Sequence, residues 1–166
     1  IKLIYVHARN AILSGISPKA NRTIPALNYD FIIRIKKKYP HINFILNGGI
    51  DSLEKAKDLS NTFDGVMLGR LIQNNPFELS KVDNYFFEEK NIIKSNEDII
   101  SSYFQYIGPK IKIDSIFRLL SPLLSIFFGV PNSKSLKNEV NECIKNGNLE
   151  LIESIFLSFV KEKRLL

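Results

Sequence analysis

The first half of the chain alternates between short, continuous apolar runs and stretches with helical spacing. Three apolar runs predict β-strands, at Leu3–Val6, Ile42–Leu46 and Asp64–Leu68. The segments that follow them predict helices, at Tyr29–Tyr39 up to Pro40, at Leu53–Leu59 behind an Asp51 or Ser52 cap, and at Leu71–Leu79. Strands that are apolar throughout and alternate with helices are typical of parallel βα units. We expect three such units, too few to close a barrel or a stable sheet alone.

The second half has helical spacing throughout, after a polar stretch at residues 80–97. It predicts helices at Asp98–Ile107, Ile111–Phe128 with a break at Pro122, Lys134–Asn146 and Leu149–Lys163. Gly147 lies between the last two and is a natural helix stop. The predicted fold class is therefore α/β plus all-α, with a βα domain at 1–84, a linker at 85–97 and a helical domain at 98–166.

Charge is distributed unevenly along the 166 residues, whose net charge is +6. Residues 1–84 hold twelve Lys and Arg against seven Asp and Glu, whereas residues 85–166 hold eleven against ten. The excess suits a polyanionic partner, and it equally suits a solvated basic face centred on residues 36–38. No apolar run reaches the roughly 18 to 20 residues of a membrane span, so we expect no membrane association.

Cysteine and histidine are scarce. The single cysteine, Cys143, excludes an intramolecular disulfide and a multi-cysteine zinc site, and its helical setting favours an inert thiol in a reducing compartment. Two histidines, His7 and His41, leave little room for metal chemistry. The opening Ile1–Val6 reads as a strand already in progress, so we expect a piece of a longer chain.

Two predicted strands end in glycine-bearing loops, at 47–50 (Asn-Gly-Gly-Ile) and at Gly69-Arg70. Glycine allows positive φ and close approach of a ligand, and free N–H groups ahead of a helix favour anions. The 21 residues from Gly48 to Gly69 match one βα repeat, so both loops should lie at the same edge of the sheet. This is the position of the phosphate site in (β/α)8 barrels, with Arg70 as a forked donor; the alternative is a pair of tight turns. His7 ends the first strand and belongs to the same edge.

The residues after the first strand carry a family resemblance. His7–Arg22 reads HARNAILSGISPKANR, is followed by Ile24-Pro25, and resembles the A-type tRNA-dihydrouridine synthases, with their pattern H-A-R-x-A-x-L-x-G-L-S-P-K-x-N-R. The loop at 47–50 and the run from Asp64 to Arg70 follow in the family's order and spacing. The match is strong over residues 1–84 and weaker over the helical part.

The resemblance implies an FMN-binding TIM barrel, here its last three βα units, followed by a C-terminal helical tRNA-binding domain. Such enzymes reduce D-loop uridines of tRNA to 5,6-dihydrouridine with NADPH. It further implies that His7 meets the isoalloxazine ring, and that the phosphate end of FMN is held by Asn47, Gly48, Gly49, Gly69 and Arg70.

The resemblance also implies tRNA contacts in both halves, at Lys19 and Arg22 in the long loop and at Lys134 and Lys137 in the helical domain. The helical segment 127–137 is similar to the family's F-x-G-x-P-G-A-R-x-W-R. Lys134 and Lys137 stand where the family has arginines, and Ser121-Pro122 replaces its usual Arg-His. Lysine cannot reproduce the forked contact of arginine.

The family's catalytic cysteine belongs to an upstream βα unit, and Cys143 is in the wrong domain to replace it. We therefore expect this chain to be inactive alone, and its parent to be cytoplasmic or organellar. Two alternatives remain open. Another FMN-binding barrel, such as a dihydroorotate dehydrogenase-like enzyme, would share the phosphate loops without explaining His7–Arg22. A non-catalytic RNA-binding module would bind tRNA but no flavin.

Overall fold

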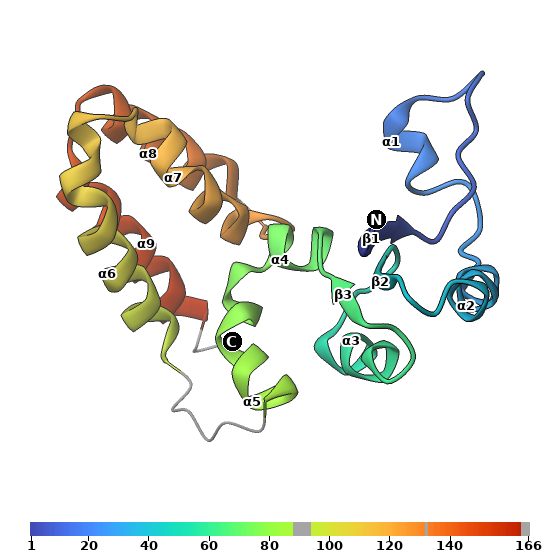
Figure 1. The fold of residues 1–166 in the computed structure, drawn as a ribbon. Helices are drawn as coiled ribbons and strands as arrows, with labels where there is room; N and C mark the ends of the chain where they lie inside the picture. Colours follow the sequence, from blue (N-terminus) through green and yellow to red (C-terminus); the bar gives the residue numbers. More distant parts are fainter. Residues whose placement is uncertain (88–93, 132, 164–166) are drawn as a thin grey trace. The chain divides into compact units, whose positions relative to one another are not determined.

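The chain is described here by a computed structural model that covers residues 1–87, 94–131 and 133–163. It divides into two compact units, which we describe separately (Figure 1). The first combines Ile1–Ile72 with the described part of Val82–Glu89, and the second combines Gln73–Lys81 with the described residues from 94 onward. Residues 88–93 of the predicted linker at 85–97 lie outside the described residues, and the domain boundaries stay a prediction.

The first unit is built on a parallel sheet of strands β1 (Leu3–His7), β2 (Asn43–Asn47) and β3 (Gly65–Met67), in the order β1-β2-β3. All three predicted strands are present. β1 and β2 pair from Leu3 opposite Asn43 to His7 opposite Asn47, and β3 joins β2 with Met67 opposite Asn47. The three strands therefore end level with one another at their carboxyl ends.

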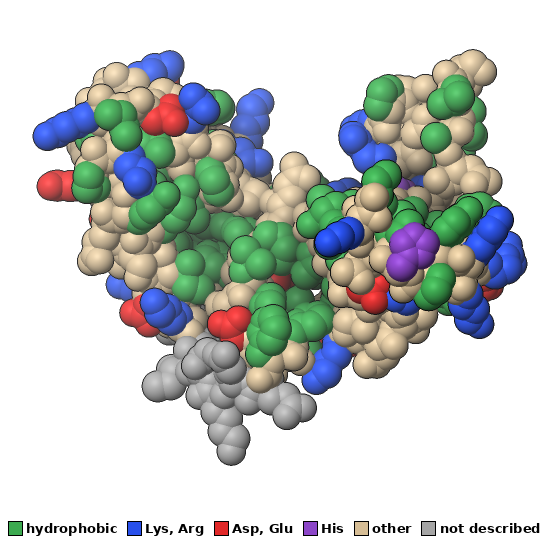
Figure 2. All heavy atoms as spheres, viewed as in Figure 1, with side chains coloured by type: hydrophobic (Ala, Val, Ile, Leu, Met, Phe, Trp, Pro, Cys, Tyr) green, Lys and Arg blue, Asp and Glu red, His purple; other side chains and the backbone are tan. Residues whose placement is uncertain are grey.

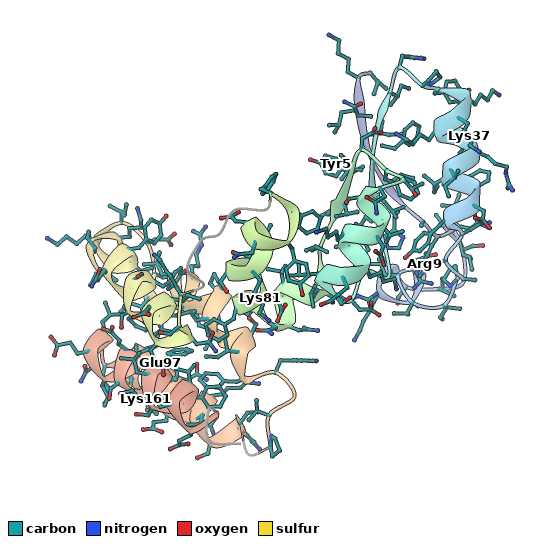
Figure 3. The ribbon with its side chains drawn as sticks, turned by 90° about the horizontal axis from the view of Figure 1, so that it is seen from below. Tyr5, Arg9, Lys37, Lys81, Glu97 and Lys161 are labelled. Atoms are coloured by element: carbon teal, nitrogen blue, oxygen red, sulfur yellow. The ribbon has the colours of Figure 1, made fainter. Side chains whose placement is uncertain are left out.

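Helices α2 (Tyr29–Lys38) and α3 (Leu53–Ser60) follow the first two strands, as the apolar spacing predicts. Ile32 of α2 packs with Phe44 and Leu46 of β2 in the core of this unit. Side chains alternate along a strand, so the odd-numbered residues of β1 face away from that core. Tyr5 projects from the strands on the side away from α2 and is 67% exposed (Figure 3).

The long connection between β1 and α2 contains the short helix α1 (Pro18–Asn21), which the apolar pattern did not predict. Ser17 caps it by accepting a hydrogen bond from Ala20 N. The side-chain amide of Asn21 pairs with both peptide groups of Ile12, donating to its carbonyl at 2.7 Å and accepting from its N–H at 2.8 Å. These contacts fold the connection back on itself.

The third predicted helix, Leu71–Leu79, is wrong as a single element. The structure has α4 (Arg70–Asn74), then the 3₁₀ turn η1 (Pro76–Lys81), then α5 (Val82–Phe86). Pro76 has no N–H to continue the α-helical ladder, so the chain restarts there with a tighter geometry. Tyr85 of α5 donates to Glu54 of α3 at 2.8 Å, which holds α5 against α3 within the first unit.

The second unit is a helical bundle. Its elements after η1 are α6 (Asn96–Ile107), η2 (Gly108–Lys112), α7 (Ile116–Leu124), η3 (Ser125–Phe127), α8 (Ser133–Lys145) and α9 (Leu149–Lys163). α6 and α8 both pack against α9. Phe127 and Phe156 stack at 5.1 Å between ring centroids, and Phe159 meets Phe127 edge-on at 4.8 Å. This aromatic cluster forms the centre of the core.

Two helix predictions in this unit can be compared with the structure, one around Pro122 and one at Gly147. The expected helix from Ile111 to Phe128 is divided before Ile116 and after Leu124, and α7 runs through Pro122 rather than breaking there. Pro122 has no N–H to donate to the Arg118 carbonyl. The Ser121 hydroxyl donates to that carbonyl instead, at 2.9 Å. Gly147 does stop α8: its φ is +68°, and Asn148 N donates to Cys143 O across the turn.

In the part of the chain that the structure describes, no helix is long and apolar enough to cross a membrane.

Candidate functional site

The carboxyl ends of the three strands bring His7, Asn47 and Met67 into one row. The parallel register places His7 opposite Asn47, and Asn47 opposite Met67. Asn47 Nδ2 lies 3.4 Å from the sulfur of Met67. Because ligands of parallel sheets bind beyond the carboxyl ends of strands, this row is the floor of the candidate site. Of the three, Met67 was not among the predicted site residues.

The Gly48-Gly49 turn follows β2 directly and requires glycine at both positions. Its φ angles are +115° and +67°, a region that L-residues rarely adopt. A Cβ on Gly48 would lie 3.1 Å from His7 Cε1, and one on Gly49 would overlap Leu27 Cδ1. The turn is thus packed between the His7 ring and Leu27, so a simple solvent-exposed turn does not describe it.

Backbone hydrogen bonds fix the approach of the long connection to this turn. Ala8 N donates to Asn47 O at 2.9 Å, and Asn28 N donates to Ala8 O at 2.8 Å. Arg9 and Leu27 form an antiparallel bridge beside them. These contacts explain why Leu27, far from the glycines in sequence, reaches them in space.

The charges of three arginines act on His7. Burial lowers the pKa of His7, and the positive charges of three arginines, Arg9, Arg70 and Arg22 in decreasing order of effect, lower it further. The imidazole is therefore neutral at pH 7, in a locally positive field. Arg70 and Arg22 come from different segments, after β3 and after α1, and both act on the same ring. This arrangement favours an anionic ligand.

Arg9 is a site residue that sequence analysis passed over. Its Nη1 donates to the carbonyl of Pro25, which ties both ends of the long connection together. Its Nε is buried and has no hydrogen-bond partner in the described part of the chain. The labelled side chain in Figure 3 comes from the connection directly after β1. The Ala-Arg that follows His7 in the quoted motif was the available signal.

Gly69 and Arg70 lie directly after β3, at the start of α4, and both are exposed. A Cβ on Gly69 would meet nothing within 4 Å, and its φ is not in the left-handed region. Neither packing nor backbone conformation within the described residues demands glycine there. The close approach of a ligand to the backbone would explain a glycine at position 69.

The four predicted tRNA-contacting residues fall in different units. Lys19 and Arg22 lie in and just after α1, both exposed, and Arg22 is the one whose charge reaches His7. Lys134 and Lys137 lie one turn apart on α8 of the helical unit. Figure 2 shows Lys and Arg side chains gathered over α2. Lys36 of this helix forms an ion pair with Asp64, so one lysine of the 36–38 run contributes to the fold.

Redox and metal ligands are sparse around the site. The single cysteine, Cys143, is buried in the core of the helical unit. Among residues 1–87, 94–131 and 133–163, no group of three or more His, Cys, Asp or Glu could hold a metal ion.

The site combines parallel βα units, a glycine turn with positive φ and the charges of three arginines at the carboxyl edge, an arrangement typical of β/α proteins that bind anions. The comparison with known families is specific. The model of the dihydrouridine synthase family matches residues 1–161, and the chain belongs to this family.

Curated relatives share this assignment. Three tRNA-dihydrouridine(20/20a) synthases are similar to the chain. The protein of Shewanella oneidensis is 34% identical over 156 residues, 92% of this chain and 47% of the relative. That of Pseudomonas syringae is 38% identical over 133 residues, 80% and 40% of the two chains, and that of Vibrio cholerae is 35% identical over 138 residues, 82% and 42%. The chain thus spans less than half the length of these relatives. The family match favours this assignment over a dihydroorotate dehydrogenase-like barrel.

Proposed function

We propose that the complete protein is a flavin-dependent tRNA-dihydrouridine synthase. In this proposal residues 1–84 are the last three βα units of an FMN-binding TIM barrel and residues 98–166 are a tRNA-binding domain, with 85–97 as linker. The substrate is uridine of the tRNA D-loop, at positions 20 and 20a as the names of the relatives specify. NADPH is the proposed reductant.

The residues at the carboxyl edge fit the chemistry of FMN. A flavin phosphate needs a preorganised anion site, and three arginine charges converge on His7 beside a glycine turn. In the proposal Asn47, Gly48, Gly49, Gly69 and Arg70 hold the phosphate end, and the neutral His7 ring contacts the isoalloxazine. FMN, when bound, supplies the hydride that reduces the uracil ring. The reaction also needs one proton, and Cys143 is not proposed as its donor because it is buried in the helical core.

Arg22 connects the two ligands of the proposal. It is exposed and lies near enough to His7 to lower its pKa, so a uridine brought to the flavin would approach the same cation. Lys19 belongs to the adjoining helix, and Lys134 and Lys137 provide further positive charge from the helical unit. Dispersed cations of this kind are what a tRNA backbone requires.

The observation that carries the proposal is the family match over residues 1–161, together with the arginines around His7. Its test is complementation. The complete gene is expressed in bacteria that lack their own dihydrouridine synthases, and dihydrouridine in purified tRNA is measured by mass spectrometry. We expect dihydrouridine to return at D-loop positions, and FMN to purify with the protein.

An Arg70→Ala variant sharpens this test. Removing a charge-assisted phosphate contact should weaken FMN binding about 10- to 100-fold. Arg34→Ala, an exposed arginine of α2, is the matched control. A protein that binds flavin but forms no dihydrouridine would contradict the proposed reaction, and one that binds tRNA without flavin would be an RNA-binding module.

A further inference from the structure

The Gly48-Gly49 turn is held from behind by two side chains of the flanking helices. The hydroxyl of Tyr29, the first residue of α2, donates to the carbonyl of Gly48 at 2.7 Å. Lys55, in α3, donates through Nζ to the carbonyl of Gly49 at 2.5 Å. Two consecutive carbonyls are therefore each bound by a side chain from a different helix.

The direction of these carbonyls fixes the direction of two N–H groups. A trans peptide group is planar and its C=O and N–H point in opposite directions. The Gly48 carbonyl shares its peptide with the N–H of Gly49, and the Gly49 carbonyl with the N–H of Ile50. Neither N–H donates a hydrogen bond to any other residue that the structure describes. Both are thus turned away from Tyr29 and Lys55 and left available for an anion.

Contacts around the turn hold both donors beside it. Leu27 lies against both glycines, and the Tyr29 hydroxyl would be 3.2 Å from a Cβ on Gly49. Lys55 is also positioned from its own helix, where its N–H is capped by Ser52 and its Nζ lies 3.4 Å from Asp51. The two donors are held at fixed places before any ligand arrives. Without them, each glycine peptide could rotate at little steric cost, because glycine populates both signs of φ.

We infer that Tyr29 and Lys55 are positioning residues for the phosphate-binding turn: they hold its carbonyls so that the N–H groups of Gly49 and Ile50 face the phosphate of FMN. This inference rests on the proposed function, because it assumes that the anion at the turn is a flavin phosphate. It adds two residues outside the Gly-Gly and Gly-Arg motifs. Neither residue is proposed to touch the ligand.

Riboflavin makes the inference testable, because it is FMN without the phosphate. Flavin affinity of the complete apo-protein is measured by fluorescence titration with both ligands. The variants are Tyr29→Phe, which removes only the hydroxyl, and Lys55→Met. We expect each to weaken FMN binding about three- to tenfold, the range for one hydrogen bond, while riboflavin binding stays within twofold of the unmodified protein.

Matched controls separate the positioning effect of Tyr29 and Lys55 from general effects on the stability of the fold. Tyr39→Phe makes the same chemical change at the other end of α2, and Lys57→Met removes the same charge two residues along α3. Both should leave the FMN-to-riboflavin ratio unchanged. Lys55→Arg keeps a cationic donor, and it should recover part of the FMN affinity that Lys55→Met loses.

Each other outcome has a definite meaning. If the unmodified protein prefers FMN and the two variants keep that preference, the positioning role is wrong while the phosphate site stands. If the variants weaken FMN and riboflavin equally, Tyr29 and Lys55 only stabilise the fold, and the inference is overturned. If the unmodified protein binds both flavins equally, the proposed phosphate site fails, and the inference fails with it.

Discussion

Lys36 and Asp64 join helix α2 to the amino end of β3 across 28 residues of sequence. Lys36 Nζ lies 2.5 Å from Asp64 Oδ2, and the same oxygen accepts a hydrogen bond from Phe44 N at 2.8 Å. One carboxylate thus links a helix, the central strand and the edge strand. It lies at the opposite end of the sheet from the candidate site, where contacts in β/α proteins serve stability.

Acidification should weaken this link. The Lys36 hydrogen bond, with the Phe44 N–H, lowers the pKa of Asp64 below its ordinary 3.8. A carboxylate whose folded pKa is depressed stabilises the fold above the unfolded pKa, and that contribution is lost as pH falls through the folded pKa. We expect Asp64→Asn to lower the free energy of unfolding by about 1 kcal/mol at pH 7 and by less at pH 3. Chemical denaturation at both pH values measures this. Equal losses at the two would contradict the charge-dependent role.

The two glycine loops should respond differently to alanine. Gly48→Ala forces a Cβ at φ +115° to within 3.1 Å of His7, so we expect destabilisation of about 1–3 kcal/mol together with loss of flavin binding. Gly69→Ala meets no neighbour and no left-handed φ, so the melting temperature should stay unchanged. If Gly69→Ala nonetheless weakens FMN binding, the close approach of a ligand at β3 is supported. A stable Gly48→Ala protein with normal flavin affinity would contradict the packing argument.

The sequence was sufficient to predict the row of strand ends but not what surrounds it. His7, Asn47 and Gly69 could be placed at one edge because parallel strands of equal register must end together. The proximity of Arg22 to His7 depends on how the connection between β1 and α2 closes. That closure is made by the Arg9 contact with Pro25 and the Asn21 contact with Ile12, neither of which periodicity encodes.

Proline explains two boundary errors in opposite directions. Pro76 ends α4, where helical spacing alone had continued the helix, whereas Pro122 is accommodated within α7. The difference lies in the neighbouring side chain, since Ser121 satisfies the Arg118 carbonyl. Tyr29 and Lys55 were not identified as site residues because their role is visible only in contacts with backbone carbonyls, 19 and 6 residues away.

The pKa of His7 offers a direct test of the arginine cluster. Arg70 is one of the positive charges that lower it, so Arg70→Ala should raise the pKa of His7 toward 6.5. Because the folded pKa lies below the unfolded value, protonation favours the unfolded chain as pH falls below about 6.5. Titration of the imidazole resonances by NMR measures the change, with His41 as an internal reference. An unchanged His7 pKa would place Arg70 away from the site.

The sheet face opposite α2 predicts how residues 1–166 behave as an isolated polypeptide. Leu3, Tyr5 and Met67 on the strands are 45%, 67% and 42% exposed. Apolar sheet surface of this kind, with open edges, promotes association. Light scattering should show oligomers, and Tyr5→Lys should shift them toward monomer, unlike Tyr39→Lys on the end of α2. A monomeric unmodified polypeptide would show that this face needs no cover.

The proposed RNA role of the helical unit can be read from salt dependence. Cations that touch phosphates release counterions, so the logarithm of affinity falls with the logarithm of salt concentration by about 0.7 to 0.9 per neutralised phosphate. Lys134 is exposed and Lys137 lies one turn further along α8, so both can reach a backbone phosphate. Replacing both by alanine in the complete protein should weaken tRNA binding at low salt and flatten the slope by up to roughly 1.4 to 1.8. FMN affinity should not change. Filter binding across a salt series, with the exposed Lys112 and Lys161 replaced together as control, decides the question. An unaffected slope would show that Lys134 and Lys137 do not contact RNA phosphates. That result is expected if binding at these positions needs the forked contact of arginine, which lysine cannot make.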